Sequence, residues 1–483
     1  MNTFVNSTMR TFILSLLATI IYDVMGADKT VMLIEFARHG TRVPFSSVVE
    51  KVPDWMKQYP LVEVTGVGLR QHYNLGKEIG VKFADLFDGI KYSDIYVRST
   101  RIQRTIGSAT AHLMGISDMF PFEPLPFLKD DHRAYPPYTS MDMNTMTFST
   151  GLPNAYTPLP IYSASVDQEE FVHELSEGSC PVGYKRANEL FNKMRDDLNK
   201  NQKFVDLTIE ACKALGVNCE SHGTKFDVMT EMSDFIGLDW RNNPNPILPR
   251  SHPLYGPIRR QIDLYCTYQM LDPVLKKVTS APMLLEVLTR FQRKIKGTEF
   301  VPKYIYYSTH DTVLAPMLHT LEQLDAECYL KDVNNANNAT YCGVFPDTAA
   351  SVIFELFKNS TGYFMRFYYN LEKKRLWGKT EMTVEEFDTL LGQRIDRNYR
   401  NYCRTQPGPS PAPTPTPSTN SDGGIWKTLG VICIVLFVLQ LFGGIGYYFY
   451  RKSQEGRKPS KPENTNSYLQ VEDAMSSSRE ESP

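Results

Sequence analysis

A heptapeptide near the start of the chain combines residue types that suit phosphate chemistry. Residues 38–44 read Arg-His-Gly-Thr-Arg-Val-Pro and follow the apolar run 30–37, which is typical of a buried strand. Ligands of open α/β sheets bind beyond the carboxyl ends of the strands, so His39 is expected at such a place. Arg38 and Arg42 can bind phosphate oxygens bidentately while the imidazole faces phosphorus in line.

Two further elements place polar residues after predicted strands. Arg98 follows one such run, with Arg104 one turn into the next predicted helix, and an arginine and a helix N-terminus both favour an anion. His310 and Asp311 follow another, where the histidine can donate to phosphate and the carboxyl can protonate a leaving oxygen. Each element alone has a plainer explanation, as a solvated charge or a chance dipeptide. Three of them, each after its own strand, favour a functional site.

The elements that must position these residues alternate between strands and helices. Strands are expected at 30–37, 94–97 and 303–307, with helices at 68–83 and after Thr100, where Thr100 and Gln103 would form a capping box. This alternation predicts an α/β fold, with a mostly parallel central sheet flanked by helices.

Two regions depart from that alternation. Residues 351–357 and 363–369, joined by a turn, are expected to form a hairpin on the edge of the sheet. Residues from about 121 to 273 are rich in Pro, Tyr and Met with scattered helical stretches. They are interpreted as an inserted, mainly helical cap over the sheet.

The two ends of the chain read as export and anchoring segments. The apolar stretch in 1–26 predicts a signal peptide, and the uncharged stretch in 425–450, followed by basic residues, predicts a transmembrane helix. Between them lie an expected ectodomain (27–403) and a Pro-rich stalk (404–424). The tail 451–483 is expected in the cytosol, where Tyr468-Leu-Gln-Val would bind an adaptor protein as an extended peptide.

Charge and cysteine usage narrow the class of protein further. A formal net charge of −2 gives no basis for expecting a nucleic-acid partner. Of the eight cysteines, Cys433 lies in the predicted span and the others lie in the ectodomain, where an exported compartment permits disulfides. Because the ectodomain then holds seven cysteines, an odd number, at least one thiol is expected to stay free or to pair between chains. Two glycosylation sequons, at Asn338 and Asn359, agree with export.

The three elements together resemble the histidine acid phosphatase family, which includes lysosomal and prostatic types. Its signature R-H-G-x-R-x-P is met by residues 38–44, and residues 64–79 look like the helix that follows it in the family. The resemblance implies a phosphoglycerate-mutase-like fold and hydrolysis of small phosphate monoesters. The predicted topology places this domain in the lumen or outside the cell, and Tyr468 would direct it from the cell surface to endosomes or lysosomes. A homodimer is also expected. One departure is Arg101, where the family commonly has an acidic residue, and this puts substrate preference in doubt.

The resemblance also implies a role for each matching residue. His39 would be the nucleophile that forms a phosphohistidine, and Asp311 would protonate the leaving alcohol. The phosphoryl oxygens would be held by Arg38, Arg42, Arg98 and His310, with no metal or cofactor, because guanidinium groups supply the positive charge.

Two matters stay open in the sequence. A phytase-like phosphatase of the same family is one alternative function, and a receptor or adhesion ectodomain that lost catalysis is another, although none of the expected site residues is missing. For the disulfides, the resemblance implies that Cys180 pairs with Cys403 and that Cys219 pairs with Cys342 or Cys328.

Overall fold

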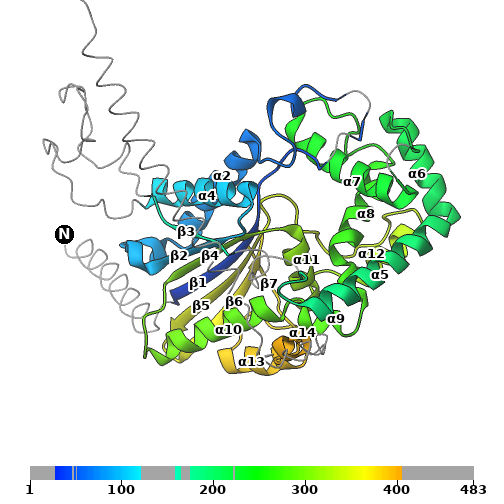
Figure 1. The fold of residues 1–483 in the computed structure, drawn as a ribbon. Coiled ribbons are helices and arrows are strands. Elements are labelled where there is room, and N and C mark those ends of the chain that lie inside the picture. Colours follow the sequence, from blue (N-terminus) through cyan, green and yellow to red (C-terminus); the bar gives the residue numbers. More distant parts are fainter. Residues whose placement is uncertain are drawn as a thin grey trace, which may run out of the picture. The chain divides into compact units, whose positions relative to one another are not determined.

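The computed structural model describes residues 28–45, 48–49, 52–120, 158–164, 175–220 and 223–404. Within them, seven strands form one sheet in the order β3-β2-β4-β1-β5-β6-β7 (Figure 1). The strands are β1 (Lys29–Arg38), β2 (Ile95–Ser99), β3 (Ile161–Tyr162), β4 (Tyr304–Thr309), β5 (Ser351–Asn359), β6 (Gly362–Tyr369) and β7 (Glu372–Lys374). The first four strands in sequence are parallel to one another, and β5, β6 and β7 are antiparallel to their neighbours. The predicted α/β architecture and the β5–β6 hairpin are confirmed, although β7 forms the edge beyond the hairpin.

Helices cover both faces of the sheet. On one face lie α2 (Gly66–Lys82), α3 (Ala84–Phe87) and α4 (Gln103–Met119); on the other lie α10 (Ala281–Lys296), α11 (Asp311–Thr320) and α13 (Val384–Gly392). Successive side chains of β1 alternate between these layers: Leu33 packs with the first group, and Ile34 with the second. The central strands are therefore buried on both faces, as their continuous apolar sequences predict.

Helices α2 and α4 pack through glycines. A Cβ atom added to Gly76 would lie 2.1 Å from the carbonyl oxygen of His112, and one added to Gly115 would lie 2.0 Å from that of Tyr73. The two backbones are therefore in direct contact. The predicted capping box at Thr100 is wrong, because α4 begins at Gln103 with Ile102 as its N-cap and with no side-chain cap.

The range expected to form the cap contains both helices and a strand. Its described helices are α5 (Pro181–Lys200), α6 (Gln202–Leu215), α7 (Lys225–Asn242) and α8 (Tyr255–Thr267), which gather beyond one end of the sheet (Figure 1). The two-residue strand β3 lies in the same range and pairs with β2. That pair belongs to the sheet and not to a helical cap.

Three disulfides join described cysteines: Cys180–Cys403, Cys212–Cys219 and Cys328–Cys342. The first is as expected. The pairing expected for Cys219 is wrong, since its partner is Cys212, seven residues away. The seventh ectodomain cysteine, Cys266, is a buried thiol on α8.

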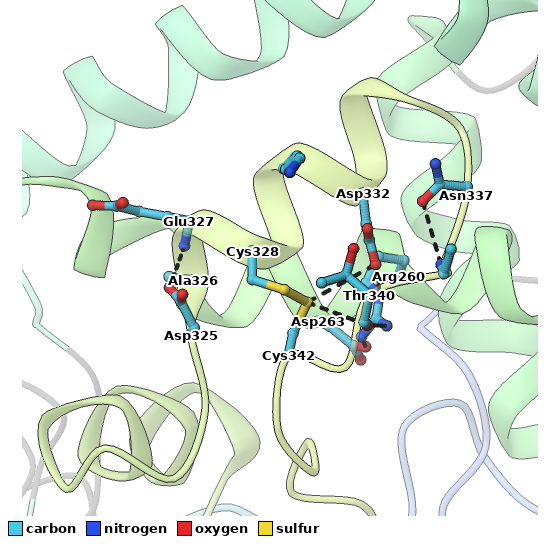
Figure 2. The surroundings of a disulfide bond; sticks show 12 residues. Arg260, Asp263, Asp325, Ala326, Glu327, Cys328, Asp332, Asn337, Thr340 and Cys342 are labelled. Atoms are coloured by element: carbon cyan, nitrogen blue, oxygen red, sulfur yellow. Dashed lines mark hydrogen bonds and ion pairs between the residues drawn. A yellow bond between two sulfur atoms is a disulfide. The ribbon is translucent and has the colours of Figure 1, made fainter.

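The Cys328–Cys342 bridge lies beside a cluster of charged residues (Figure 2). Arg260 forms ion pairs with Asp263 on its own helix at 3.1 Å and with Asp332 at 3.2 Å. Asp332 belongs to α12 (Ala326–Asn334), the helix that carries Cys328. These contacts hold α12 and its loop against α8, one of the cap helices.

The remaining described helices are short, and the chain termini fall outside the description. α9 (Leu275–Val278) precedes α10, and α14 (Tyr399–Arg404) carries Cys403. The described helices include none with the length and apolar character that a membrane span requires. The expected signal peptide, span and tail with Tyr468 lie outside the described residues, as does the expected stalk except for Arg404.

Acid is expected to destabilise the fold through His72. Burial lowers the pKa of this fully enclosed imidazole from 6.5 to about 3. Between these values the unfolded chain binds a proton that the folded chain excludes, so stability is full above pH 6.5 and is lost as pH falls towards 3. The loss amounts to about 1.4 kcal/mol per pH unit. Denaturant titrations at pH 4, 5 and 6 give the free energy of unfolding at each pH. In His72→Gln this free energy should change less with pH, by the amount just given, and an equal pH dependence in the wild type and the variant would contradict the assignment.

Candidate active site

The register of the parallel strands brings two histidines together. Arg38 at the end of β1 lies opposite Thr309 at the end of β4, so the next residues, His39 and His310, leave the same edge of the sheet. Their rings lie 5.3 Å apart, centroid to centroid, at an interplanar angle of 68°. Thr100 follows β2 at the same edge, and its Oγ1 lies 3.1 Å from His310 Nε2. Residues far apart in sequence thus share one site.

His39 is buried and held in one tautomer. Its Nδ1 lies 2.8 Å from the carbonyl oxygen of Gly40, which can only accept, so Nδ1 carries the proton and Nε2 carries the lone pair. Burial lowers the pKa of His39 well below its ordinary value, and the positive charges of His310 and three nearby arginines lower it further. The imidazole therefore stays neutral in mild acid, with Nε2 available as a nucleophile.

Arg38 connects the first element to the third. Its guanidinium forms an ion pair with Asp311 at 2.5 Å and donates to the carbonyl oxygen of Pro346 at 3.0 Å. Asp311 is the first residue of α11, and its side chain remains 14% exposed, whereas that of Arg38 is 4% exposed. The carboxyl group can therefore exchange protons with the cavity while Arg38 stays enclosed behind it.

Arg42 is held by the cap. Two of its nitrogens donate to the carboxylate of Asp234 on α7, at 3.0 and 2.9 Å, and its guanidinium lies over the ring of Phe45, 4.0 Å from the centroid. This bidentate pair is the geometry that a guanidinium also presents to a phosphate. The pair therefore fixes the orientation of Arg42 from the cap side.

The third arginine at the cavity is Arg104. It lies in the first turn of α4, only 9% exposed, and burial together with Arg42 lowers its pKa to about 10. Arg98, the residue expected from the sequence, is half-buried on β2 in register with Tyr307, and the cavity lining does not include it. Val97 and Ser99, its neighbours, face the α4 side of the sheet, so Arg98 faces the opposite side.

The loop that carries His39 rests directly on α2. A Cβ atom on Gly40 would lie 2.2 Å from the carbonyl oxygen of Gly68, so only glycine fits there. The amide of Gly40 donates to Ser108 Oγ at 2.9 Å, and His72 Nε2 lies 2.8 Å from the carbonyl oxygen of Arg38. Helices α2 and α4 thus fix the backbone on both sides of His39.

These residues surround a cavity of about 330 Å³ between the sheet edge and the cap. The expected residues His39, Arg42, His310 and Asp311 line it, Arg104 joins them, and Arg38 lies just behind Asp311. Helices α7 and α8 form the opposite wall. Among the described residues, no cluster of three His, Cys, Asp or Glu side chains is arranged to hold a metal ion.

The site lies where the parallel strands of an α/β sheet end. It combines two imidazoles, several guanidinium groups and the carboxyl group of Asp311, and it is typical of proteins that bind and transfer anionic groups. Residues 31–370 match the histidine phosphatase superfamily (branch 2), and the chain belongs to this family. The resemblance found in the sequence is confirmed.

The individual relatives have low sequence identity to this chain but match it over most of its length. Human lysosomal acid phosphatase is 21% identical over 418 residues, covering 83% of this chain and 87% of its own. Human prostatic acid phosphatase is 20% identical over 382 residues, covering 76% and 86%. The crystal structure of a Klebsiella phytase covers 77% of this chain and 96% of its own with a TM-score of 0.51 and 18% identity, which supports the fold alone.

Proposed function

We propose that this protein is an acid phosphatase that hydrolyses phosphate monoesters through a phosphohistidine at His39. The observation that carries the proposal is the buried, neutral His39, whose Nε2 is free of the proton that Nδ1 holds, beside His310 and the cavity arginines. Family membership and relatives named as acid phosphatases support it.

In the first step, His39 Nε2 attacks phosphorus in line. The Nε2–P bond forms as the ester P–O bond breaks, and Asp311 gives its proton to the leaving oxygen. Arg42, Arg104 and His310 bind the phosphoryl oxygens, whose negative charge they stabilise most as phosphorus becomes five-coordinate. In the second step, water attacks phosphorus, the N–P bond breaks, and the proton of that water returns to Asp311.

The Arg38–Asp311 ion pair places a guanidinium beside the expected acid. A phosphoryl group competes with the carboxylate for the Arg38 guanidinium, because both are anions that a planar fork accepts. Exchange of this ion pair for a contact with the substrate would release the Asp311 carboxyl group to face the leaving oxygen.

The two alternatives fit less well. A receptor or adhesion ectodomain that lost catalysis would have lost some of the site residues, yet His39, Asp311 and their neighbours meet at one cavity. A phytase binds a ring bearing many phosphates, and the described cap wall of this cavity carries Glu231 and Asp234. None of the described residues on that wall is basic, whereas each additional phosphate of such a ring needs a positively charged partner.

Placement outside the cytosol is part of the same proposal. The signal peptide, stalk and transmembrane helix expected from the sequence, together with relatives named lysosomal, support an anchored luminal or extracellular enzyme. Sorting through adaptor binding at Tyr468 and assembly as a homodimer complete it.

The proposal is tested by measuring the rate of hydrolysis of two phosphate esters that differ in their leaving group. The purified chain should hydrolyse phenyl phosphate and glycerol phosphate fastest below neutrality, because His39 stays neutral there and the leaving oxygen gains a proton more easily. Asp311→Asn should slow the alkyl ester about 100-fold and the aryl ester far less, since phenolate leaves without a proton.

The same kinetics can contradict the proposal. A wild-type chain that is folded and hydrolyses neither ester would refute the function. Equal losses on both esters in Asp311→Asn would leave the function standing and remove Asp311 from the acid role.

A further inference from the structure

The turn that precedes β5 binds Arg38 and His39, although the mechanism assigns it no part. The amide of Ala349 donates to the carbonyl oxygen of His39 at 3.1 Å. The amide of Arg38 donates to the carbonyl oxygen of Ala350 at 3.0 Å, and the Arg38 guanidinium donates to that of Pro346, also at 3.0 Å. This short segment therefore contacts the backbone on both sides of the nucleophile.

The turn contains a residue in a disfavoured conformation. The amide of Ala350 donates to the carbonyl oxygen of Asp347 at 2.9 Å, which closes a four-residue turn with Ala349 in the third position. Ala349 has a φ of 59°, in the left-handed region that glycine adopts readily and alanine does not. A residue other than glycine keeps this conformation only where the surrounding structure holds it. The amide that binds His39 thus belongs to a residue that needs outside support.

The cap supplies that support through Asp347. Nε of Arg241 on α7 donates to Asp347 Oδ1 at 3.1 Å, and a second nitrogen of the same guanidinium pairs with Oδ2. Arg250 lies 3.5 Å from the same carboxylate, with its guanidinium 3.6 Å from the ring centroid of Trp240. Asp347 Oδ1 also accepts from the amide of Thr348 at 2.8 Å. The carboxylate therefore joins its own turn to two arginines.

The pair with Arg241 is suited to fixing the turn. The Arg241 side chain is 15% exposed and that of Asp347 is 41% exposed, and a guanidinium that binds a carboxylate through two nitrogens restricts the orientation of both groups. Asn242, the next residue of α7, donates to Thr41 Oγ1 at 3.0 Å. The end of α7 thus contacts the loop after His39 directly, and Asp347 connects the same helix end to the turn that binds His39.

We propose that Asp347 is a positioning residue, whose ion pair with Arg241 keeps Ala349 in the left-handed conformation and so orients His39 for attack on phosphorus. This role rests on the proposed function, because it concerns the geometry of the same nucleophile. Asp347 is not among the described residues that line the cavity, so it acts through the turn and not on the substrate. Loss of the ion pair should slow the attack, which needs an aligned Nε2, more than it weakens phosphate binding.

The variant Asp347→Asn tests this role, because it removes the charge and keeps the size of the side chain. With the purified full chain in excess over phenyl phosphate, the single-turnover rate constant for release of phenol at saturating enzyme should fall about tenfold. Inhibition by inorganic phosphate should stay within about twofold of the wild type. A loss of stability alone lowers the fraction of folded enzyme and leaves this rate constant unchanged, so a merely structural residue would give a different result.

A second substitution should restore the rate. Glycine adopts a positive φ without the help of the ion pair, so Ala349→Gly added to Asp347→Asn should return the rate constant to within about threefold of the wild type. Arg241→Gln should slow the same step about tenfold. Its combination with Asp347→Asn should slow the step no further, since the two residues form one pair.

A matched control removes the charge of another ion-paired aspartate. Asp118 on α4 is half exposed, pairs with Lys77 at 2.9 Å and does not line the cavity, so Asp118→Asn should keep the wild-type rate constant. An unchanged rate constant in Asp347→Asn, or one that stays low after Ala349→Gly is added, overturns the positioning role while turnover by the wild type upholds the phosphatase. Absence of turnover by the folded wild type overturns both.

Discussion

Replacement of His39 by alanine is expected to abolish turnover of aryl and alkyl phosphates alike, by on the order of 10⁴-fold or more. The loss is the same for both because both esters need the Nε2–P bond to form, whatever their leaving group. Rapid acid-free quenching of the wild type during turnover should trap a labile phosphoprotein that is absent from His39→Ala. Added imidazole should restore part of the activity, since the cavity left by the ring can admit it.

His319 provides the matched control. It lies nine residues beyond His310 on α11, about 13 Å along the helix, and does not line the cavity. His319→Ala should keep both the phosphoprotein and the turnover. Full activity in His39→Ala, or a phosphoprotein that persists there, would remove His39 from the nucleophile's role.

The second large effect is a loss of kcat/KM that is expected at Arg104 but not at Arg98, six residues earlier. Arg104→Gln should lower kcat/KM for phenyl phosphate about 100-fold or more, because a guanidinium at the cavity stabilises the charge of the transition state. It should also weaken inhibition by inorganic phosphate, which binds the same groups. Arg98→Gln should change kcat/KM less than about threefold, since Arg98 does not line the cavity.

Both variants need a check of folding, because each arginine contacts other residues. Thermal unfolding of Arg98→Gln and Arg104→Gln should be compared with that of the wild type before rates are interpreted. If Arg98→Gln loses inhibition by phosphate while Arg104→Gln keeps it, Arg98 binds phosphate, as expected from the sequence, and the assignment of Arg104 from the structure is wrong.

These two arginines also show which parts of the site can be predicted from sequence patterns. The strand, the heptapeptide and the His-Asp pair could be placed because apolar runs and the residues after them are local signals. The position of Arg98 at a strand end favours a role in the site, but alternation along β2 puts it on the other face from Val97 and Ser99. Arg104 lines the cavity from the first turn of α4, which starts at Gln103, later than the expected cap at Thr100.

Tertiary partners were the least predictable from sequence. Cys212 and Cys219 are joined because α6 ends at Leu215 and the chain turns back, a geometry that spacing alone does not specify. The place of Asp234 and Glu231 at the cavity depends on how α7 packs against the sheet edge. A signal did exist in their spacing of three, which puts both carboxylates on one helix face.

The contacts between bare backbones make some glycines far less replaceable than others. Gly40, Gly68, Gly76 and Gly115 have no room for a Cβ atom, because each would meet a carbonyl oxygen at 2.2 Å or less. Gly216, by contrast, has a positive φ and open space around it, so asparagine is tolerable there. In a library of all single substitutions, selection for activity should remove even alanine at the first four positions. The tolerance profile of this enzyme would then trace two backbone contacts, one between the nucleophile loop and α2 and one between α2 and α4, neither of which contains a catalytic side chain.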